Sequence, residues 1–197
     1  MPATPVTAGA QPAQPVPPAP TVPVGRSRRS LCLALAASWV VLDAITKAVV
    51  IRALADGPVT VVPGAVQLTL LRNPGSAFSL ATGYTTVLSL LAATVVVGVV
   101  RYSARLRSTP WAVALGFLLG GAAGNLADRL FRAPGFLRGY VVDWVRLYHG
   151  THSWPVFNVA DSGITCAAVL VVVLSVTGRR VDGSRVDSSR VPRGERS

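Results

Sequence analysis

The chain has 197 residues, of which 51% are hydrophobic and 14% charged, and its mean hydropathy is +0.50. Soluble globular domains carry about 25% charged residues, so this composition excludes an ordinary soluble domain and favours burial in a bilayer. The net charge of +11 comes from arginines in short clusters beside apolar segments. That distribution argues against a nucleic-acid-binding protein, whose basic residues would follow one long face.

The two ends of the chain differ in composition from the middle. Residues 1–25 contain no charged residue and are rich in Pro, Ala, Thr, Val and Gln. Such a segment cannot bury enough apolar surface to offset its chain entropy, so we expect a disordered leader. Residues 181–197, rich in Arg and Ser, are expected to be a disordered tail for the same reason. One membrane-embedded domain is therefore predicted at residues 26–180.

Four apolar segments approach the roughly 20 residues that an α-helix needs to cross a bilayer. They comprise residues 30–52, 84–104, 111–131 and 157–178. The first also resembles a secretory signal peptide, because arginines precede its apolar run. No cleavage site of small residues follows and the run continues to Ile51, so we expect this helix to be retained. The sequence therefore predicts an all-α membrane protein with four transmembrane helices.

Arginine clusters precede the first predicted helix, join the second to the third, and follow the fourth. Positively charged connections stay on the cytoplasmic side of a membrane. We therefore expect a multi-pass protein of the bacterial cytoplasmic (inner) membrane, with both termini in the cytoplasm. The arginines are Arg26, Arg28, Arg29, Arg101, Arg105, Arg107, Arg179 and Arg180.

Two outer loops, at residues 53–83 and 132–156, carry most of the polar residues. In the first, residues 59–62 and 65–71 partly alternate apolar and polar side chains around a Pro-Gly turn. This pattern predicts a small extracytoplasmic β-hairpin on the membrane surface. The second outer loop is expected to be an amphipathic stretch.

The third predicted helix carries three glycines spaced four residues apart. Glycines at this spacing share one helix face and let a neighbouring helix approach closely. We therefore expect another helix to pack against Gly116, Gly120 and Gly124.

Acidic residues are rare in the predicted membrane domain. Between residues 30 and 178 the charged groups other than arginine are Asp43, Asp56, Asp128, Asp143, Asp161 and Lys47. A charge in hydrocarbon costs several kcal/mol unless it is paired or hydrated, so those within helices need partners. Asp43 and Lys47 are one helical turn apart, the spacing of an ion pair. The pair is either a structural clamp or a device that positions catalytic groups.

Polar residues also mark the outer ends of the third and fourth helices. Asn125 needs a hydrogen-bond partner in apolar surroundings and is expected to face the bundle interior. Asp128 and Arg129 stand at the helix end, where such residues commonly form an interfacial pair. Asn158 and Asp161 have the spacing of a helix-capping pair, which by itself would give Asp161 a structural role.

Asp143, in the second outer loop, is by itself an interfacial carboxylate. Two carboxylates that approach each other in a partly dry site share one proton, so one acts as base and the other as acid near neutral pH. If Asp143 and Asp161 approach in this way, the ionised one can deprotonate a water that attacks a peptide carbonyl. The protonated one can donate to the developing oxyanion or leaving amine. This is the chemistry of an aspartic peptidase.

Five motifs occur in order: Asp43-x-x-Thr46-Lys47, Asn73-Pro-Gly75-Ser-Ala77-Phe78, Gly124-Asn125-Leu-Ala-Asp128-Arg129, Val141-Val-Asp143-Trp144 and Phe157-Asn158-Val-Ala160-Asp161-Ser162. Each is weak alone, but together they closely resemble the bacterial lipoprotein signal peptidases, also called signal peptidase II. The resemblance implies an aspartic endopeptidase that cuts a prolipoprotein on the amino side of a cysteine already bearing a diacylglyceryl group.

The resemblance also implies roles for individual residues. Asp143 and Asp161 would form the catalytic dyad near the outer face of the membrane, and Asp43, Lys47 and Asp128 would be structural supports. Residues that bind substrate or shape the site would be Asn73, Gly75, Ala77, Asn125, Arg129, Asn158 and Ala160.

Two other functional classes compete with this interpretation. A Ser and Lys dyad would use Lys47 with Ser76 or Ser79, but Asp43 one turn away keeps the lysine charged and makes it a poor base. A small transporter or proton-conducting bundle would spread polar residues through the membrane depth. Here they gather toward the outer ends of the helices.

A metal-dependent mechanism is the remaining alternative. His149, His152 and Asp143 would supply the ligands, but the two histidines lack the helix-borne spacing of a zinc peptidase. We therefore expect no metal or other cofactor and no nucleic-acid partner. The expected partners are diacylglyceryl-prolipoprotein substrates and membrane lipids.

Overall fold

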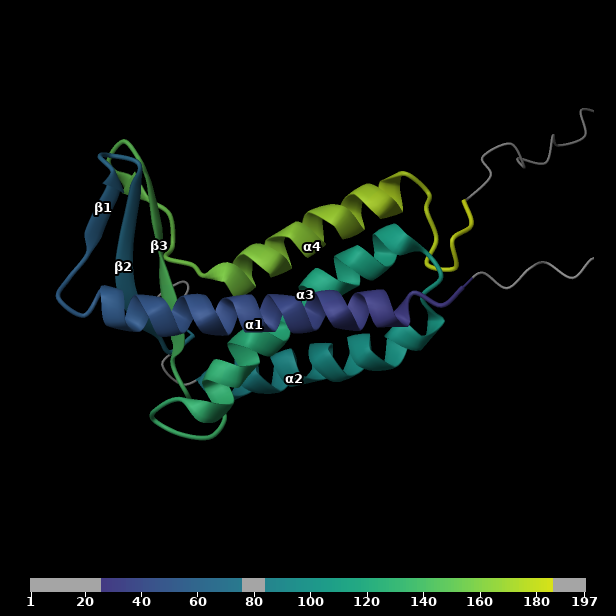
Figure 1. Cartoon of the computed structure of the whole chain (residues 1–197), viewed down its shortest axis with the longest axis horizontal. Helices are drawn as coiled ribbons and strands as arrows, with labels where there is room; N and C mark the ends of the chain where they lie inside the picture. Colours follow the sequence, from purple (N-terminus) through teal and green to yellow (C-terminus); the bar gives the residue numbers. More distant parts are fainter. Residues whose placement is uncertain (1–25, 76–83, 186–197) are drawn as a thin grey trace, which may run out of the picture.

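The computed structural model describes residues 26–75 and 84–185 (Figure 1). The expected leader at residues 1–25, Ala77 and the last 12 residues of the expected tail, 186–197, lie outside the described residues. Four helices of the described part are long and apolar enough to cross a membrane. They are α1 (Arg29–Ala53), α2 (Thr85–Tyr102), α3 (Thr109–Phe131) and α4 (Val159–Val176), and a 3-10 turn, η1 (Ser103–Arg105), extends α2. The four predicted helices are confirmed.

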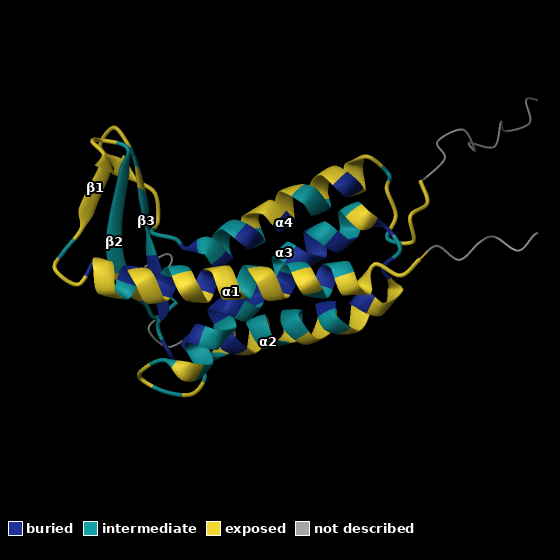
Figure 2. Cartoon of the chain, viewed as in Figure 1, coloured by how far each residue is buried: buried dark blue, intermediate teal, exposed yellow. Residues whose placement is uncertain are grey.

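Helix α3 lies at the centre of the bundle and packs against α1, α2 and α4. The three outer helices carry exposed residues along their length, whereas α3 is mostly buried (Figure 2). Among the exposed side chains are Val41 on α1, Leu91 on α2 and Val172 on α4. Apolar faces on helices whose main-chain groups are internally bonded suit contact with lipid tails.

The glycines of α3 permit the close approach of α1. A Cβ atom on Gly120 would lie 2.6 Å from Trp39 Cβ and 3.0 Å from the carbonyl oxygen of Ala36. A Cβ on Gly116 would lie 3.0 Å from Leu35 Cβ. The expected packing of a neighbouring helix on this face is confirmed.

A four-stranded antiparallel sheet stands at one end of the bundle (Figure 1). Its strands are β1 (Val59–Val62), β2 (Val66–Asn73), β3 (Val141–His149) and β4 (His152–Ser153), in that order across the sheet. Strands β1 and β2 form the predicted hairpin. Strands β3 and β4 come from the second outer loop, where we expected an amphipathic stretch.

Strand β3 forms because its sequence suits a strand and β2 offers a free edge. Val141, Val142, Trp144 and Val145 are β-branched or aromatic residues, which favour a pleated, half-buried surface. The unpaired N–H and C=O groups on the second edge of β2 then pair with this segment. The pairing fixes the position of Asp143.

The sheet is anchored to the helices by a small apolar cluster. Val142 packs with Val50 and Leu54 at the end of α1, and Trp144 lies against them. Val145, which follows Trp144, exchanges main-chain hydrogen bonds with Phe157, shortly before α4 begins. Strand β3 and the start of α4 are therefore held side by side.

Candidate active site

Polar residues from five elements converge where the sheet meets the helices. All of them, apart from Asn73, Arg129, Arg132 and Asp161, are at least nine-tenths buried. Helix α1 supplies Asp43 and Lys47, and α3 supplies Asn125, Asp128, Arg129 and Arg132; β2 supplies Asn73, β3 supplies Asp143, and α4 with its cap supplies Asn158 and Asp161.

Asp143 is buried, with 2% of its surface exposed, and is held by two neutral amides. Asn73 Nδ2 donates to Oδ2 at 2.8 Å, and Asn158 Nδ2 donates to Oδ1 at 2.7 Å. Burial, as the largest cause, raises the pKa of Asp143 to about 7. The nearby charge of Asp161 also raises this pKa, whereas the hydrogen bonds from the two amides lower it. Near neutral pH this group is therefore poised between its two protonation states.

Asp161 closes the predicted capping box at the start of α4. Its N–H donates to Asn158 Oδ1 at 2.9 Å, and the N–H of Asn158 donates back to Asp161 Oδ2 at 3.1 Å. Asn125 Nδ2 donates to the other oxygen, Oδ1, at 2.7 Å. The helix-capping interpretation of Asp161 is confirmed, and the same carboxylate also belongs to the buried cluster.

Asn158 connects the two carboxylates. Its side-chain amide donates to Asp143 while its main-chain N–H donates to Asp161. Asn158 is fully buried, so this double contact is shielded from water. The two acids are thus close enough for the charge of Asp161 to act on Asp143.

The orientation of the Asn125 amide follows from its neighbours. Its Oδ1 accepts from Lys47 Nζ and from Asn158 Nδ2, both at 3.1 Å. Because an ammonium and an NH2 group can only donate, the amide oxygen must face them and the amide nitrogen must face Asp161. The expectation that Asn125 faces the bundle interior is confirmed.

Lys47 forms a second, charged cluster beside the amides. Its Nζ lies 2.7 Å from Asp43 Oδ2 and 2.9 Å from Asp128 Oδ2, and only 1% of its side chain is exposed. The remaining oxygen of Asp43 accepts the N–H of Ala160 at 3.0 Å. Asp128 Oδ2 also accepts the N–H of Val142 at 3.1 Å. The predicted Asp43–Lys47 pair is confirmed, and its carboxylates tie α1 to α4 and α3 to β3.

The expected pair of Asp128 with Arg129 is wrong. Asp128 forms its ion pairs with Lys47 and with Arg132, which is one helical turn further along α3. Neighbouring residues on a helix point in different directions, whereas residues four apart share a face, so Arg132 is the better placed partner. The i,i+4 spacing in the sequence contained this signal, which we missed.

Arg129 instead points toward the amide-held acids. Its Nη1 donates to the carbonyl oxygen of Asn125 at 3.2 Å. Its positive charge interacts with the carboxylates of Asp161, Asp143 and Asp128. Its Nε is buried and has no hydrogen-bond partner within residues 26–75 and 84–185.

Gly75 helps to orient Asn73. The N–H of Gly75 donates to Asn73 Oδ1 at 2.8 Å, which leaves the amide nitrogen directed at Asp143. Gly75 has φ of 111°, and a Cβ there would lie 2.7 Å from Leu88 Cδ1. The positive φ favours glycine here, and a larger residue would also require the end of the Leu88 side chain to shift. Ala77, expected in the same loop, lies outside the described residues.

The residues of the competing mechanisms are arranged differently. His149 and His152 face each other across the exposed β3–β4 turn, six residues along β3 from Asp143, or about 20 Å. In the described ranges no group of three or more His, Cys, Asp and Glu could hold a metal ion. Lys47 is paired with Asp43 and Asp128. Ser76 and Ser79 lie outside the described residues.

Comparisons with known proteins give the chain its family. A family model described as signal peptidase (SPase) II matches residues 35–177. A lipoprotein signal peptidase of Rhodococcus jostii is 50% identical over 81% of this chain and 79% of its own, and one of Mycobacterium avium is 51% identical over 79% and 84%. Two solved structures described as a bacterial membrane enzyme share the fold. Their TM-scores are 0.65 and 0.62, at 24% and 25% identity, and each covers 75% of this chain, with 88% and 93% of the solved chains matched. The chain belongs to the signal peptidase II family.

Proposed function

We propose that this protein is an intramembrane aspartic endopeptidase that removes the signal peptide from diacylglyceryl-modified prolipoproteins. Cleavage would fall on the amino side of the lipidated cysteine, with Asp143 and Asp161 as the catalytic dyad. The observation that carries this proposal is the amide-bridged pair of acids, one of them with a pKa of about 7. Membership of the signal peptidase II family supports the same activity.

The two acids differ in the form that their contacts favour. Asp143 is buried and only partly charged near pH 7, so it is suited to hold the shared proton and to donate it to the developing oxyanion or leaving amine. Asp161 accepts hydrogen bonds from Asn125 and from the N–H of Asn158 at the start of α4. These contacts hold the Asp161 carboxyl group in the position in which, in this proposal, it deprotonates the attacking water.

The surrounding residues have supporting roles in this proposal. Asn73 and Asn158 hold Asp143, and Asn125 holds Asp161. Arg129 has unsatisfied donor capacity next to the acids and is suited to bind a substrate carbonyl. Asp43, Lys47 and Asp128 keep α1, α3, α4 and β3 in register. Gly75, Ala77 and Ala160 would shape the space for the substrate chain.

A substrate path beside the dyad is available at the sheet. A cavity of about 290 Å³ lies next to Asn73, between β2 and residues 153–156, and Arg146 and Trp154 form part of its wall. The outer helices expose apolar faces, so the lipid chains of the substrate and of the membrane can lie against the same bundle. We therefore propose prolipoproteins and membrane lipids as the partners, without a metal or a nucleic acid.

The proposed location is the bacterial cytoplasmic membrane, with both termini in the cytoplasm and the dyad near the outer face. The support is the charge distribution: the arginine clusters stand at the ends of the helices opposite the sheet. Cysteine labelling from either side of intact cells tests it. Labels at Thr60 and Ser153 should be reached from outside, and labels at Ser27 and Ser184 from inside only.

The deciding experiment is cleavage of a diacylglyceryl-prolipoprotein by the purified full-length chain in detergent. The wild-type chain should release the signal peptide, and Asp143→Asn and Asp161→Asn, purified with unchanged thermal unfolding, should not. A chelator should leave the rate unchanged, because the described residues contain no ligand set. Inhibition that zinc reverses, or proton flux through liposomes without any cleavage, would overturn the proposal.

A further inference from the structure

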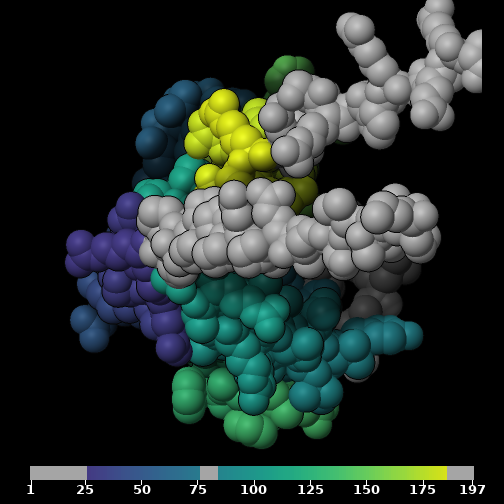
Figure 3. All heavy atoms as spheres, turned by 90° about the vertical axis from the view of Figure 1, so that its right-hand side faces the viewer, coloured from purple at the N-terminus to yellow at the C-terminus, as the bar shows by residue number. Residues whose placement is uncertain are grey.

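The end of the bundle opposite the carboxylates is built from three parts of the chain. The N–H of Arg28, before α1, donates to Leu106 O in the α2–α3 connection at 2.9 Å. The N–H groups of Arg107 and Ser108 donate to Val181 O, beyond α4, at 3.1 and 3.0 Å. Figure 3 shows this end of the molecule, with the start of α1, the α2–α3 connection and the end of α4 on one face. Val181, at the start of the expected tail, thus packs against the bundle, whereas residues 182–185 are exposed.

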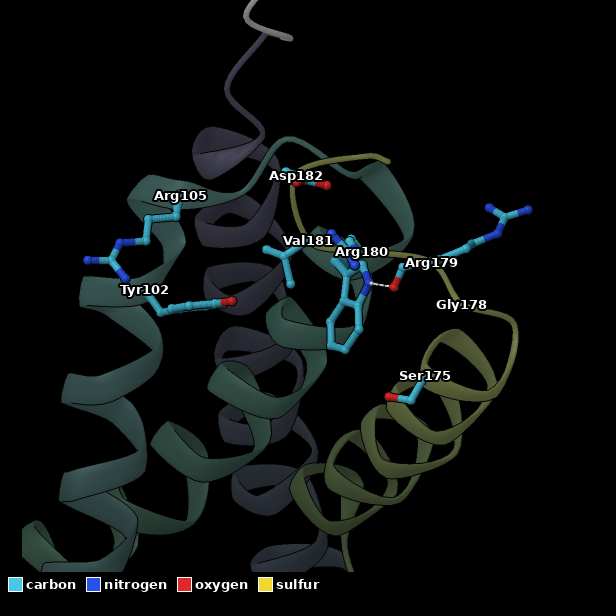
Figure 4. Close-up of a pocket in the computed structure, with 9 residues that line it drawn as sticks. Tyr102, Arg105, Ser175, Gly178, Arg179, Arg180, Val181 and Asp182 are labelled. Atoms are coloured by element: carbon cyan, nitrogen blue, oxygen red, sulfur yellow. Dashed lines mark hydrogen bonds between the residues drawn. The ribbon is translucent and has the colours of Figure 1, made fainter. Parts of the chain in front are cut away.

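A cavity of about 550 Å³ opens at this end between the ends of α2 and α4 and the start of α3. Tyr102, Arg105 and Trp111 line it on one side, and Arg179, Arg180 and Asp182 on the other. Trp111 is fixed there, because its Nε1 donates to Arg179 O at 2.9 Å. Figure 4 shows the guanidinium groups of Arg105 and Arg179 extending to opposite sides, with Arg180 between them.

Among the described residues, arginines outnumber carboxylates in the wall of this cavity. Three arginines and one aspartate line it, so its side chains sum to +3 − 1 = +2. Within the described ranges, no salt bridge joins Arg105, Arg179 or Arg180 to a carboxylate. The Asp182 carboxylate is occupied by Ser184, which donates its hydroxyl at 2.7 Å and its N–H at 2.8 Å. These bonds lower the pKa of Asp182, so it stays ionised.

A second cavity continues the same basic surface. It measures about 300 Å³, and Arg179 and Arg180 line it together with Arg107 and Arg185. Arg179 and Arg180 therefore belong to the walls of two adjoining cavities. Guanidinium groups bind phosphate oxygens in pairs of hydrogen bonds, and Tyr and Trp side chains favour the level of lipid headgroups, so this combination fits a phosphate group at a membrane surface.

We propose that this cavity binds the phosphate headgroup of an anionic phospholipid from the leaflet at that end of the bundle. The apolar surface next to the cavity favours a lipid over free phosphate. Ser175, on the last turn of α4, lines the cavity, and Val172 and Val176 beside it are 61% and 82% exposed. Acyl chains of a bound lipid can lie along these residues while the headgroup meets the arginines.

Lipid binding to the purified full-length chain in detergent, followed by native mass spectrometry, tests this inference. Phosphatidylglycerol should bind more tightly than phosphatidylcholine with the same acyl chains. The triple variant Arg105→Gln, Arg179→Gln, Arg180→Gln should weaken the first phosphatidylglycerol by on the order of 100-fold, or about fivefold for each arginine. Asp182→Asn should strengthen it, because it removes the one opposing charge of the cavity.

The matched control removes three arginines at the same end but outside the cavity: Arg26→Gln, Arg28→Gln, Arg29→Gln. It should change the affinity by less than about fivefold, because exposed charges at a distance are screened. If the triple cavity variant fails to fold, the exposed single variants Arg105→Gln and Arg179→Gln carry the test. Equal losses in the cavity and control variants, equal binding of phosphatidylcholine, or displacement of the lipid by millimolar glycerol phosphate would each overturn the proposal.

Discussion

The two acids held by amides and the two held by cations belong to one buried cluster, yet their surroundings differ in kind. Asp143 and Asp161 receive neutral amide N–H groups from Asn73, Asn125 and Asn158. Asp43 and Asp128 face Lys47 directly. Neutral amides hold a carboxylate in place without supplying a countercharge, whereas an ammonium forms an ion pair with it. The first arrangement suits proton transfer and the second suits mechanical support.

Asn125 is the only side chain of the described cluster that bonds both to Lys47 and to one of the amide-held acids. Its amide oxygen accepts a hydrogen bond from the Lys47 ammonium, and its amide nitrogen donates one to Asp161. The Asn125 amide therefore stands between Lys47 and Asp161. A direct contact with Lys47 would give Asp161 a cationic partner as well. The intervening amide therefore preserves the difference between the amide-held half of the cluster, Asp143 and Asp161, and its charged half, Asp43 and Asp128 with Lys47.

The largest effect is expected from removing a proton site in the amide-held pair. Asp143→Asn and Asp161→Asn are nearly isosteric, so each should reduce cleavage by about 10³-fold or more while folding is retained. The double variant should be no worse than either single variant. The measurement is single-turnover cleavage of lipidated substrate, with thermal unfolding as the control for folding. Substantial turnover in either variant, together with a folded but inactive Asp128→Asn, would place Asp128 in the dyad.

Breaking the ion pairs of Lys47 with Asp43 and Asp128, the charged half of the cluster, should lower stability first. Asp43→Asn and Asp128→Asn each take one counterion from a lysine that is 1% exposed. Breaking a buried ion pair costs about 3–5 kcal/mol, although the second carboxylate on Lys47 will offset part of it. Both variants should unfold at lower temperature and give lower yield, with residual cleavage by the fraction that folds. An unchanged unfolding temperature with lost activity would contradict the supporting role.

A steric change can disturb the charged half without altering any charge. A Cβ at Gly124 would lie 2.7 Å from Asp43 Oδ2 and 3.3 Å from Ala160 Cβ. Gly124→Ala should therefore destabilise the protein by about 1–3 kcal/mol, because the helices must move apart. Gly98→Ala, in α2, is the matched control, since no atom would lie within 4 Å of a Cβ added at Gly98. Equal unfolding temperatures for the two variants would contradict the close packing of α3 on Asp43.

The pH dependence of cleavage should report the amide-held half. Asp143 must keep its proton to act as acid, so kcat/KM should fall as the pH rises through about 7. The Asn73 amide stabilises the charged form and lowers the pKa of Asp143. Asn73→Ala should therefore move this basic limb to higher pH, in addition to any loss in rate. A limb that stays in place or moves to lower pH would show that Asp143 does not control it.

The smallest effect is expected for Asp56, the carboxylate between residues 30 and 178 that lies outside the cluster. Asp56 is exposed in the turn between α1 and β1, outside both halves of the cluster. Asp56→Asn should change stability by less than about 0.5 kcal/mol and leave cleavage within experimental error. It serves as the charge-matched control for the other four aspartates. A large loss on this substitution would mean that outer-loop charge, rather than the buried cluster, governs activity.

The helices were predictable because they depend on local sequence. The lengths of the apolar runs placed all four within two or three residues of their observed ends, and the capping pair of Asn158 and Asp161 marked the start of α4. The hairpin followed from a turn dipeptide and partial alternation. Each of these signals is contained within one short stretch of chain.

The parts that depended on distant contacts were not predicted. Strand β3 exists because β2 offers it an edge about 70 residues earlier in the chain, although its β-branched and aromatic composition was a usable signal. One local contact was also missed: the pairing of Asp128 with Arg132 was visible in the i,i+4 spacing. The hydrogen bonds from side-chain amides to Asp143 and Asp161 join four separate elements, and no local pattern specifies such contacts.

The junction between β3 and α4 also has a consequence for biosynthesis. Asp143 lies on the last long strand and Asp161 on the last helix, and Asn158 joins them only once α4 has begun. Because a chain is made from its N-terminus, the cluster stays incomplete until the final helix emerges and docks against α3. A chain truncated before α4 would keep the Lys47 ion pairs but possess no dyad. With the proposed dyad, the order of synthesis would keep a nascent peptidase inactive until its insertion is complete.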